Sequence, residues 1–366
     1  MTRTAIFIVG TRAQVVKLAP VLRVAVDRGL PHRVLFTGQH RESIDDLVDD
    51  FGLESAIDKP DVSQERSTIF SLLGWTPAAL VRCIRYLRDL RAQGKPPIAI
   101  VHGDTMSTLV GAVAARLAGA PLVHVESGLS SGRMLDPFPE ELIRRMVFRF
   151  TDLAICPNDD AFERMRRRPS VRSVHTGENT LLDSVRFAVS RVPGLDDLPS
   201  RFFLASIHRF GNIYSRRRLG LVVEQLMELG GIAPVLFVLH PATEKRLREY
   251  GFWTRLASDG GIRLMPRLPY TEFLALLSRA ELVVTDGGSN QEELSYLGVP
   301  AVLMRETTER PDGLGKNVVF ERDIGPGLAS FVAGGGCQKL RRDPLVDSDV
   351  QPSESTVDAI QRLLAG

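Results

Sequence analysis

Cysteine is scarce in this sequence, and its few cysteines form no recognisable pattern. Cys83, Cys156 and Cys337 are odd in number, widely spaced and without a Cys-x-x-Cys pair. This usage excludes a disulfide framework and a cysteine-built zinc site. Because it fits a reducing compartment, we expect a cytoplasmic protein.

Long hydrophobic runs and a dominant charge of one sign are also missing. The apolar run Ala5–Val9 is too short for a signal peptide or a membrane span, and no later run is long enough. Lys and Arg number 46 and Asp and Glu 44, so the formal net charge is +2. This balance argues against nucleic-acid or membrane-surface binding and against a disordered acidic chain. We expect a soluble globular protein.

Short apolar runs alternate with longer helical patterns through most of the chain. Predicted strands cover residues 4–9, 32–36, 97–101, 121–125, 201–207, 235–239, 262–264, 282–285 and 299–304. Predicted helices include a segment that follows Arg12 and residues 107–117, 219–229, 271–278, 291–297 and 357–364. Strand, helix and strand at this spacing form the βαβ unit, whose strands lie parallel in a sheet covered by helices.

The chain's 366 residues exceed what one hydrophobic core usually organises, so we predict two doubly wound α/β domains. The Pro- and Gly-containing segment 192–199 is the predicted linker. We assign residues 1–190 to an N-terminal Rossmann-like domain and 191–345 to a second one. Residues 346–366 are predicted to pack back on the first domain, with 343–355 as a loop.

Polar side chains follow most of the predicted strands. They are Thr11, Arg12, Gln39, His40, His102, Asp104, Glu126, His208, Arg209, His240 and Asp286. Ligands of open parallel sheets bind outside the carboxyl ends of the strands. Helix capping explains many polar residues at such turns, but not, we expect, Arg12, His208, Arg209 and His240. These strand ends are therefore the predicted ligand site.

Two carboxylates and two turns indicate the kind of ligand. Asp104 and Glu126 end consecutive predicted strands, and neighbouring parallel strands lie about 5 Å apart. Burying two acids together is costly unless one of them takes part in proton transfer. Gly10–Arg12 and Asp286–Glu293 each open a predicted helix in a manner suited to phosphate. We expect a nucleotide-linked substrate in the cleft between the domains.

Several motifs occur together and in a fixed order along the chain. In the first half they are Gly10–Arg12 with Lys17–Pro20, Thr37–His40, His102–Thr105, His124–Leu129 and Pro137–Glu141 followed by Arg144. In the second half they are Gly177–Asp183, His208-Arg209, His240-Pro241, Asp286–Glu293, Met304-Arg305 and Thr308–Pro311. Together these motifs resemble those of the bacterial, non-hydrolysing UDP-N-acetylglucosamine 2-epimerase family, whose fold is two Rossmann-like domains of the glycosyltransferase-B type.

The resemblance implies a reaction. Members of the family remove the proton at C2 of the sugar while UDP leaves C1, and then add UDP back with protonation on the opposite face. The resemblance implies neither a cofactor nor a metal, and it favours a homodimer. By motif position the catalytic residues are Asp104, Glu126, Glu140 and His208. We assign proton transfer to Asp104 and Glu140, tuning or sugar handling to Glu126, and assistance to the leaving diphosphate to His208.

The resemblance also implies a set of substrate-binding residues. They are Arg12, Lys17, Arg209, His240, Phe273, Gly288, Ser289, Glu293 and Arg310. Phe273 is assigned to the uracil, Glu293 to the ribose, and Arg12, Arg209, Gly288 and Ser289 to the diphosphate. Some relatives carry a second, regulatory UDP-sugar site, whose positions here are Gln39, Arg66 and His240, but Glu42 would repel a diphosphate there.

The sequence departs from the family pattern at several positions. Gln14 and Gly211 each replace a carboxylate, Gly287 and Ser289 shift a hydroxyl donor, and Ser130 replaces an arginine. Because the reacting carboxylates are retained, we expect C2 epimerisation of a somewhat different UDP-2-acetamido sugar in a specialised biosynthetic pathway. The alternatives are a hydrolysing enzyme that releases N-acetylmannosamine and UDP, a glycosyltransferase of the same fold, and a binding protein with an inactive site.

Overall fold

The computed structural model describes residues 3–39, 44–53, 57–58, 69–132, 138–191, 197–308 and 311–365. The chain divides into two compact units. Unit 1 comprises Met1–Ser184 and Asp349–Gly366, and unit 2 comprises Val185–Ser348. The boundaries predicted from the sequence lie after residues 190 and 345.

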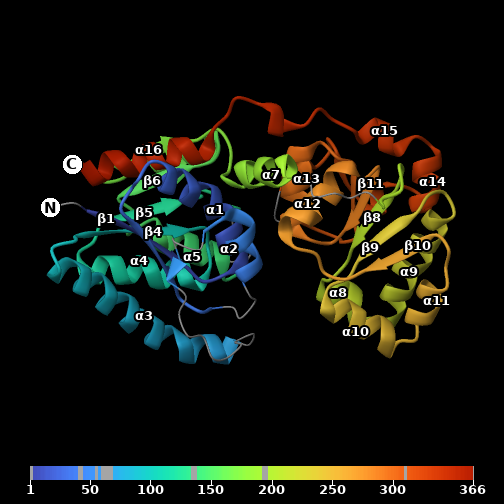
Figure 1. The fold of residues 1–366 in the computed structure, drawn as a ribbon, viewed down its shortest axis with the longest axis horizontal. Coiled ribbons are helices and arrows are strands. Elements are labelled where there is room, and N and C mark those ends of the chain that lie inside the picture. The colour runs from blue at the N-terminus through green and yellow to red at the C-terminus, as the bar shows by residue number, and fades with distance from the viewer. Residues whose placement is uncertain are drawn as a thin grey trace. The chain divides into compact units, whose positions relative to one another are not determined.

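Unit 1 is a parallel seven-stranded sheet in the order β3-β2-β1-β4-β5-β6-β7. Its strands are β1 (Thr4–Val9), β2 (His32–Phe36), β3 (Ile57–Asp58), β4 (Pro97–His102), β5 (Leu122–Val125), β6 (Leu153–Cys156) and β7 (Arg172–His175). Its helices are α1 (Arg12–Asp27), α2 (Asp45–Phe51), α3 (Ile69–Ala92), α4 (Met106–Ala118), α5 (Glu140–Val147), α6 (Asp159–Arg166) and α16 (Pro352–Ala365). Helix α16 lies beside α1 on one side of the sheet, and α3 lies beside α4 on the other (Figure 1).

Unit 2 is a parallel six-stranded sheet in the order β10-β9-β8-β11-β12-β13. Its strands are β8 (Phe203–Ser206), β9 (Val235–Val238), β10 (Ile262–Met265), β11 (Leu282–Thr285), β12 (Ala301–Leu303) and β13 (Val318–Phe320). Its helices are α8 (Phe210–Ile213), α9 (Arg216–Gly230), α10 (Pro241–Glu249), α11 (Trp253–Ala257), α12 (Tyr270–Arg279), α13 (Gly288–Leu297), α14 (Leu328–Ala333) and α15 (Gly336–Leu340). Helix α7 (Leu181–Ser190) begins in unit 1 and ends in unit 2. Two 3-10 turns, Glu321–Asp323 and Leu345–Asp347, complete the unit.

Each predicted strand is present, with ends shifted by at most two residues. Strands β3, β6, β7 and β13 were not predicted. Each has only two to four residues, too few for a periodic signal. Edge strand β7, with the sequence Arg-Ser-Val-His, is also polar. The prediction of a loop over 343–355 is wrong from Pro352 onward, because α16 begins there. Proline is favoured in the first turn of a helix, where its missing N–H has no partner to lose.

Helix α1 shows how local sequence determines an element. Thr11 accepts a hydrogen bond from the Gln14 N–H, and the Gln14 side chain returns to the Thr11 N–H, which forms a capping box. Its apolar residues, such as Val15, Leu18 and Leu22, recur with helical spacing and are buried. The helix covers the sheet with this face and brings Lys17 to the strand ends.

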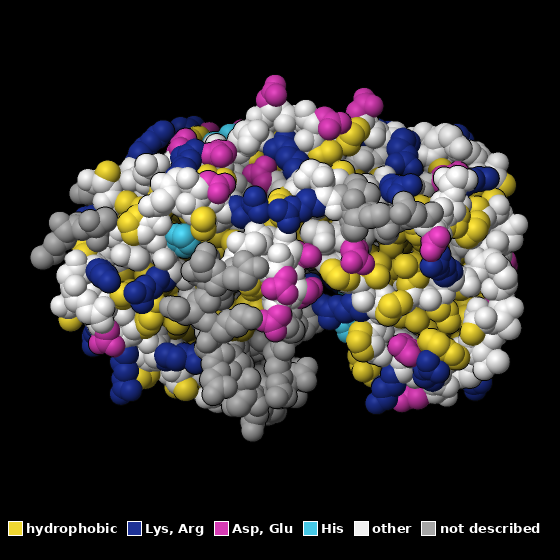
Figure 2. Space-filling model, in the orientation of Figure 1, with side chains coloured by type: hydrophobic (Ala, Val, Ile, Leu, Met, Phe, Trp, Pro, Cys, Tyr) yellow, Lys and Arg dark blue, Asp and Glu magenta, His cyan; other side chains and the backbone are white. Residues whose placement is uncertain are grey.

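The charges are mixed over the surface. Lys and Arg side chains are interspersed with Asp and Glu side chains over the face drawn in Figure 2, in keeping with the balanced composition. No helix in the described ranges is long and apolar enough to cross a membrane.

Gly10 allows the β1–α1 turn to approach α4 closely. A Cβ at this position would lie 1.8 Å from Ser107 Oγ and 2.4 Å from Thr37 Oγ1. Ser107 and Thr37 are themselves buried, so neither can move aside easily. The turn can therefore carry no side chain at this point.

We predict that Gly10→Ala lowers the free energy of unfolding by about 2–4 kcal/mol, because overpacking displaces buried groups. Gly74→Ala is the matched control, since Gly74 lies in α3 with open space around its Cβ position. That change should stabilise by about 0.5–1 kcal/mol. Urea unfolding measures both, and equal effects of the two changes would contradict the prediction.

Candidate active site

The sheet of unit 1 changes direction between β1 and β4, because the chain builds outward from β1 first to β2 and then to β4. Such a switch point leaves an open crevice at the carboxyl ends of the strands. The β1–α1 turn, Asp104 after β4 and Glu126 after β5 all lie at these ends. The predicted adjacency of the strands that carry Asp104 and Glu126 is confirmed, since β4 and β5 pair directly.

Gln14 joins the β1–α1 turn to the end of β4. Its Oε1 accepts hydrogen bonds from the N–H groups of Gly10 and Thr11, at 2.9 and 3.2 Å. Its Nε2 donates to His102 O at 2.7 Å and to Thr108 Oγ1 at 3.0 Å. An ionised glutamate has no donor for these two acceptors. Gln14, where the family has a carboxylate, therefore suits a position that offers two donors and two acceptors to its side chain.

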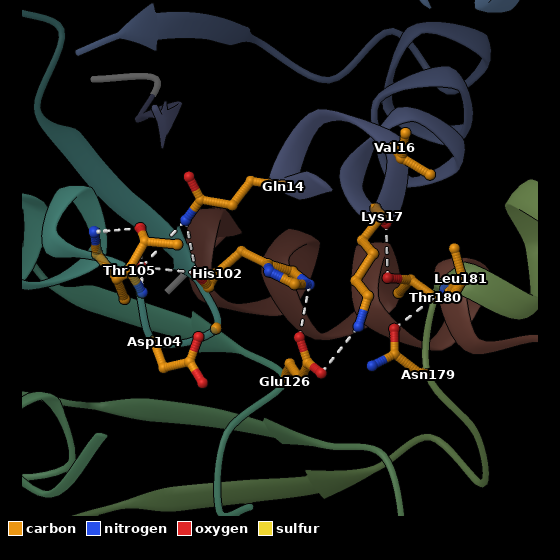
Figure 3. Close-up of polar contacts among 12 residues, drawn as sticks. Gln14, Val16, Lys17, His102, Asp104, Thr105, Glu126, Asn179, Thr180 and Leu181 are labelled. Atoms are coloured by element: carbon orange, nitrogen blue, oxygen red, sulfur yellow. Dashed lines mark hydrogen bonds and ion pairs between the residues drawn. The ribbon is translucent and has the colours of Figure 1, made fainter. Parts of the chain in front are cut away.

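The Glu126 carboxylate is held from two sides (Figure 3). Lys17 Nζ donates to Glu126 Oε1 at 3.0 Å, and His102 Nε2 lies 3.3 Å from Oε2. Glu126 is the one non-glycine residue in the described part of the chain with a positive φ, at 61°. Such a backbone costs about 1–3 kcal/mol and is found mainly where a side chain must be aimed.

The Asp104 carboxylate has a cationic partner of its own. Arg144, from α5, forms an ion pair with Asp104 Oδ2. Glu126 lies close by, because its Oε2 is 3.4 Å from the position of a Cβ on Gly103. The structure thus brings the two predicted carboxylates together, and each is balanced by a separate cation.

Helix α5 carries two further acids. Glu140 is its first residue, and its Oε2 is buried with no hydrogen-bond partner among the described residues. Residues four apart share a helix face, so Glu140 lies on the same side of α5 as Arg144, which contacts Asp104. Glu140 therefore lies on the side of α5 from which Arg144 reaches Asp104.

Glu141 is fully buried and anchors α5. Its carboxylate accepts hydrogen bonds from Ser130 Oγ, from the Ser131 N–H at 3.2 Å and from Arg145 Nε at 2.9 Å. Arg144 NH1 lies 3.6 Å from its Oε2. Burial by itself would raise the pKa of Glu141, but the hydrogen bonds from Ser130 and Arg145 outweigh it and lower that pKa.

His124 supports the turn that carries Asp104. It is fully buried, and its Nε2 lies 2.8 Å from the Gly103 carbonyl oxygen, so this nitrogen carries the proton. Its Nδ1 has no hydrogen-bond partner among the described residues. Burial lowers the pKa of His124 from 6.5 to about 4, so the ring is neutral at physiological pH.

In unit 2 the corresponding switch point lies between β8 and β11. Asp286, fully buried after β11, accepts hydrogen bonds from the N–H groups of His208 and Arg209 and from Asn212 Nδ2, at 2.8–3.2 Å. Its Oδ1 also lies 3.3 Å from His208 Nδ1. Asp286 thus orients the His208 ring, which is itself exposed.

His240 lies against His208, with the ring centroids 5.8 Å apart. The expectation that neither His240 nor Arg209 acts as a capping side chain is wrong for His240 only. The His240 side chain is the N-cap of α10 and accepts from the Ala242 N–H, so the expectation fails for this residue. An imidazole nitrogen can accept a hydrogen bond as a capping oxygen does. Arg209 occupies the N-cap position of α8, but its side chain makes no capping hydrogen bond, so capping does not explain it.

The turn that opens α13 is suited to an anion. Gly287 is its N-cap, no side chain of the described residues caps it, and Gly288 and Ser289 are its first residues. Thr285 Oγ1 accepts from the Gly287 N–H and from Asn290 Nδ2, both at 3.1 Å, which secures the turn. Uncapped N–H groups at a helix N-terminus attract phosphate oxygens.

The remaining predicted residues occupy varied surroundings. Arg12 forms a two-point ion pair with Asp46 of α2. Gln39 is buried, and its Oε1 accepts from both the N–H and the hydroxyl of Ser107 at the start of α4. Glu293 is buried in α13, and Phe273 is half-buried in α12. Arg66 and Arg310, with His40 and Glu42, lie outside the described residues.

Sequence reasoning did not assign roles to Arg144, His124 or Glu141. Each lies within a quoted motif or directly after one, but its contact is with a residue distant in sequence or with a neighbouring loop. Over the described ranges, no group of three or more His, Cys, Asp or Glu side chains is arranged to hold a metal ion.

Two doubly wound parallel units, each with polar groups at its switch point, define a fold of the glycosyltransferase-B type. A solved UDP-N-acetylglucosamine 2-epimerase from Neisseria meningitidis, bound to UDP-GlcNAc, shares this fold. The two have a TM-score of 0.76 and 24% identity, covering 98% of this chain and 100% of that chain. The predicted fold class is confirmed.

A family model described as UDP-N-acetylglucosamine 2-epimerase matches residues 23–323. The UDP-2,3-diacetamido-2,3-dideoxy-D-glucuronate 2-epimerase of Pseudomonas aeruginosa is 32% identical over 311 residues, 82% of this chain and 83% of that protein. The UDP-N-acetylglucosamine 2-epimerase of Bacillus subtilis is 30% identical over 315 residues, 83% of this chain and 79% of that protein. The chain belongs to the UDP-N-acetylglucosamine 2-epimerase family, a family of isomerases, as its motifs predicted.

We predict that His124→Gln reduces the acid sensitivity of the fold. The folded pKa of about 4 lies below the unfolded value near 6.5, so the unfolded state binds more protons between these values. Stability therefore falls as the pH falls, and the wild type should lose about 2 kcal/mol between pH 7.5 and pH 5 through this group. Urea unfolding at both pH values measures the loss. His175→Gln is the control: His175 is partly exposed, so this variant should lose as much stability between pH 7.5 and pH 5 as the wild type does. The prediction is contradicted if His124→Gln also loses as much stability as the wild type.

We predict that Glu141→Gln lowers the free energy of unfolding by about 2–3 kcal/mol at pH 7.5, because it removes a buried charge that two arginines and two loop groups contact. Glu163→Gln is the control, since Glu163 forms an exposed ion pair with Arg166 on α6. Its effect should stay within about 0.5 kcal/mol. Equal losses in the two variants, measured by urea unfolding, would rule out the anchoring role.

Proposed function

We propose that the protein epimerises C2 of a UDP-2-acetamido sugar. The observation that carries the proposal is the pair of carboxylates, Asp104 and Glu126, at the ends of neighbouring strands, each balanced by a separate cation. The named activities of the relatives support this substrate class, because both act at C2 of a sugar that bears an acetamido group there.

The proposed reaction has two stages, an elimination of UDP and its re-addition. In the first stage a base takes the C2 proton, the C1–O bond breaks, and its electron pair leaves with UDP, so that a C1=C2 double bond forms. In the second stage UDP adds back to C1 while an acid protonates C2 on the opposite face. The two faces require two proton-transfer groups, and we assign Asp104 and Glu140 to them.

Glu126 is assigned to the sugar, with Lys17 and His102 holding its carboxylate in place. His208 is assigned to the departing diphosphate, because Asp286 orients its ring from the Nδ1 side. A proton or hydrogen bond delivered to the leaving oxygen would stabilise the charge that develops there.

The nucleotide is assigned mainly to unit 2. The uncapped N-terminus of α13, with Gly288 and Ser289, suits the diphosphate, together with Arg209. Phe273 is assigned to the uracil and Glu293 to the ribose. Arg12, His240 and Arg310 remain proposed contacts of the substrate, and the regulatory site at Gln39 and Arg66 remains a prediction.

The test is incubation with UDP-2-acetamido sugars in deuterated water, followed by NMR of the sugar and nucleotide. We expect deuterium at C2 and a mixture of C2 epimers that are still linked to UDP. Free reducing sugar would instead identify the hydrolysing reaction. Absence of C2 exchange with every UDP-2-acetamido sugar offered would overturn the proposal.

We predict that Asp104→Asn slows C2 exchange by about 10²–10⁴-fold, because the amide cannot transfer the proton. The dissociation constant for UDP, measured by calorimetry, should change by less than about twofold, since Asp104 is not assigned to the nucleotide. Asp159→Asn is the control, because Asp159 is a highly exposed side chain of the same unit. Exchange that persists in Asp104→Asn at the wild-type rate would remove Asp104 from the reaction.

A further inference from the structure

Asn179 is a buried side chain of unit 1 whose amide oxygen, but not its nitrogen, has a hydrogen-bond partner among the described residues. It lies in the segment between β7 and α7 and is 7% exposed. Its Oδ1 accepts a hydrogen bond from the Leu181 N–H at 3.0 Å. This bond identifies which amide atom is the oxygen and leaves the Nδ2 group on the other side. None of the described residues accepts a hydrogen bond from Nδ2.

The segment that carries Asn179 is firmly attached to α1. Thr180 Oγ1 donates to Lys17 O at 2.6 Å, and Ser184 Oγ donates to Val16 O at 2.6 Å. Lys17 is the residue whose Nζ pairs with Glu126. The position of Asn179 relative to that ion pair is therefore determined by short, buried hydrogen bonds rather than by a free loop.

The free amide group faces the acidic side chains. Figure 3 shows the Asn179 nitrogen pointing toward the side on which Lys17 and Glu126 meet. An amide N–H group is a donor without charge, so its complement is a neutral oxygen acceptor. A donor on a largely buried side chain that has no acceptor among the described residues is open to an acceptor supplied by the ligand.

We propose that Asn179 Nδ2 donates a hydrogen bond to the carbonyl oxygen of the acetamido group at C2 of the sugar. This inference rests on the proposed function, which brings C2 to Asp104 and Glu126. The acetamido carbonyl is the neutral acceptor attached directly to that carbon. Asn179 is then a specificity-determining residue, because a sugar with a hydroxyl group at C2 would leave the amide unpaired.

The experiment compares binding of UDP, UDP-glucose and UDP-N-acetylglucosamine by calorimetry. UDP-glucose lacks the acetamido group but is otherwise the same kind of ligand. In Asn179→Ala we expect UDP-N-acetylglucosamine to bind about 10- to 100-fold more weakly, with UDP and UDP-glucose within about twofold of wild type. Asn179→Asp retains an acceptor for the Leu181 N–H but loses the donor, and it should show the same selective loss.

Thr151→Val is the matched structural control, because it removes a buried threonine hydrogen bond of unit 1, to Val147 O, and leaves the attachment of the Asn179 segment to α1 intact. It should lower the melting temperature without changing the preference for the acetamido sugar over UDP-glucose. Equal weakening of both sugar nucleotides in Asn179→Ala, or no weakening, overturns the assignment. So does a wild-type protein that binds the two equally well. Selective loss of binding in a protein without C2 exchange would support the assignment and count against the proposed reaction alone.

Discussion

The ion pair between Lys17 and Glu126 is the contact on which the site of unit 1 depends. It joins α1 to the carboxyl end of β5, and His102 at the end of β4 approaches the same carboxylate. Glu126 has a left-handed backbone, which costs about 1–3 kcal/mol, so the surroundings must hold it there. The partly buried ion pair supplies that restraint and fixes the acid at the carboxyl end of β5.

Charge balance explains how several acids can share one region. Arg144 is paired with Asp104, Lys17 with Glu126, and Arg145 with the buried Glu141. In unit 2 the carboxylate of the buried Asp286 instead accepts hydrogen bonds, mainly from N–H groups, and it orients His208. Acids held in this way keep their positions while the proton transfers that we propose take place.

The departures from the family pattern also have different physical meanings. Gln14 makes four hydrogen bonds that need both an amide oxygen and an amide nitrogen, so it is a structural link between β1 and β4. Ser130 contacts the buried Glu141, which Arg145 also contacts. The departures at Gln14 and Ser130 therefore alter residues that hold the site together, while Asp104, Glu126 and Glu140 are retained.

Sequence alone determined the α/β class, the longer strands and the pairing of strands that carry Asp104 and Glu126, because hydrophobic periodicity and strand-end chemistry are local signals. The sequence also identified the family, because many short motifs occur in the family's order along the chain. Short strands such as β6 and β7 left no periodic signal. Only the tertiary structure decided the partners: Arg144 pairs with Asp104, Lys17 pairs with Glu126, and His124 hydrogen-bonds to the Gly103 carbonyl. These contacts join residues far apart in the chain, and packing in three dimensions, not local preference, selects them.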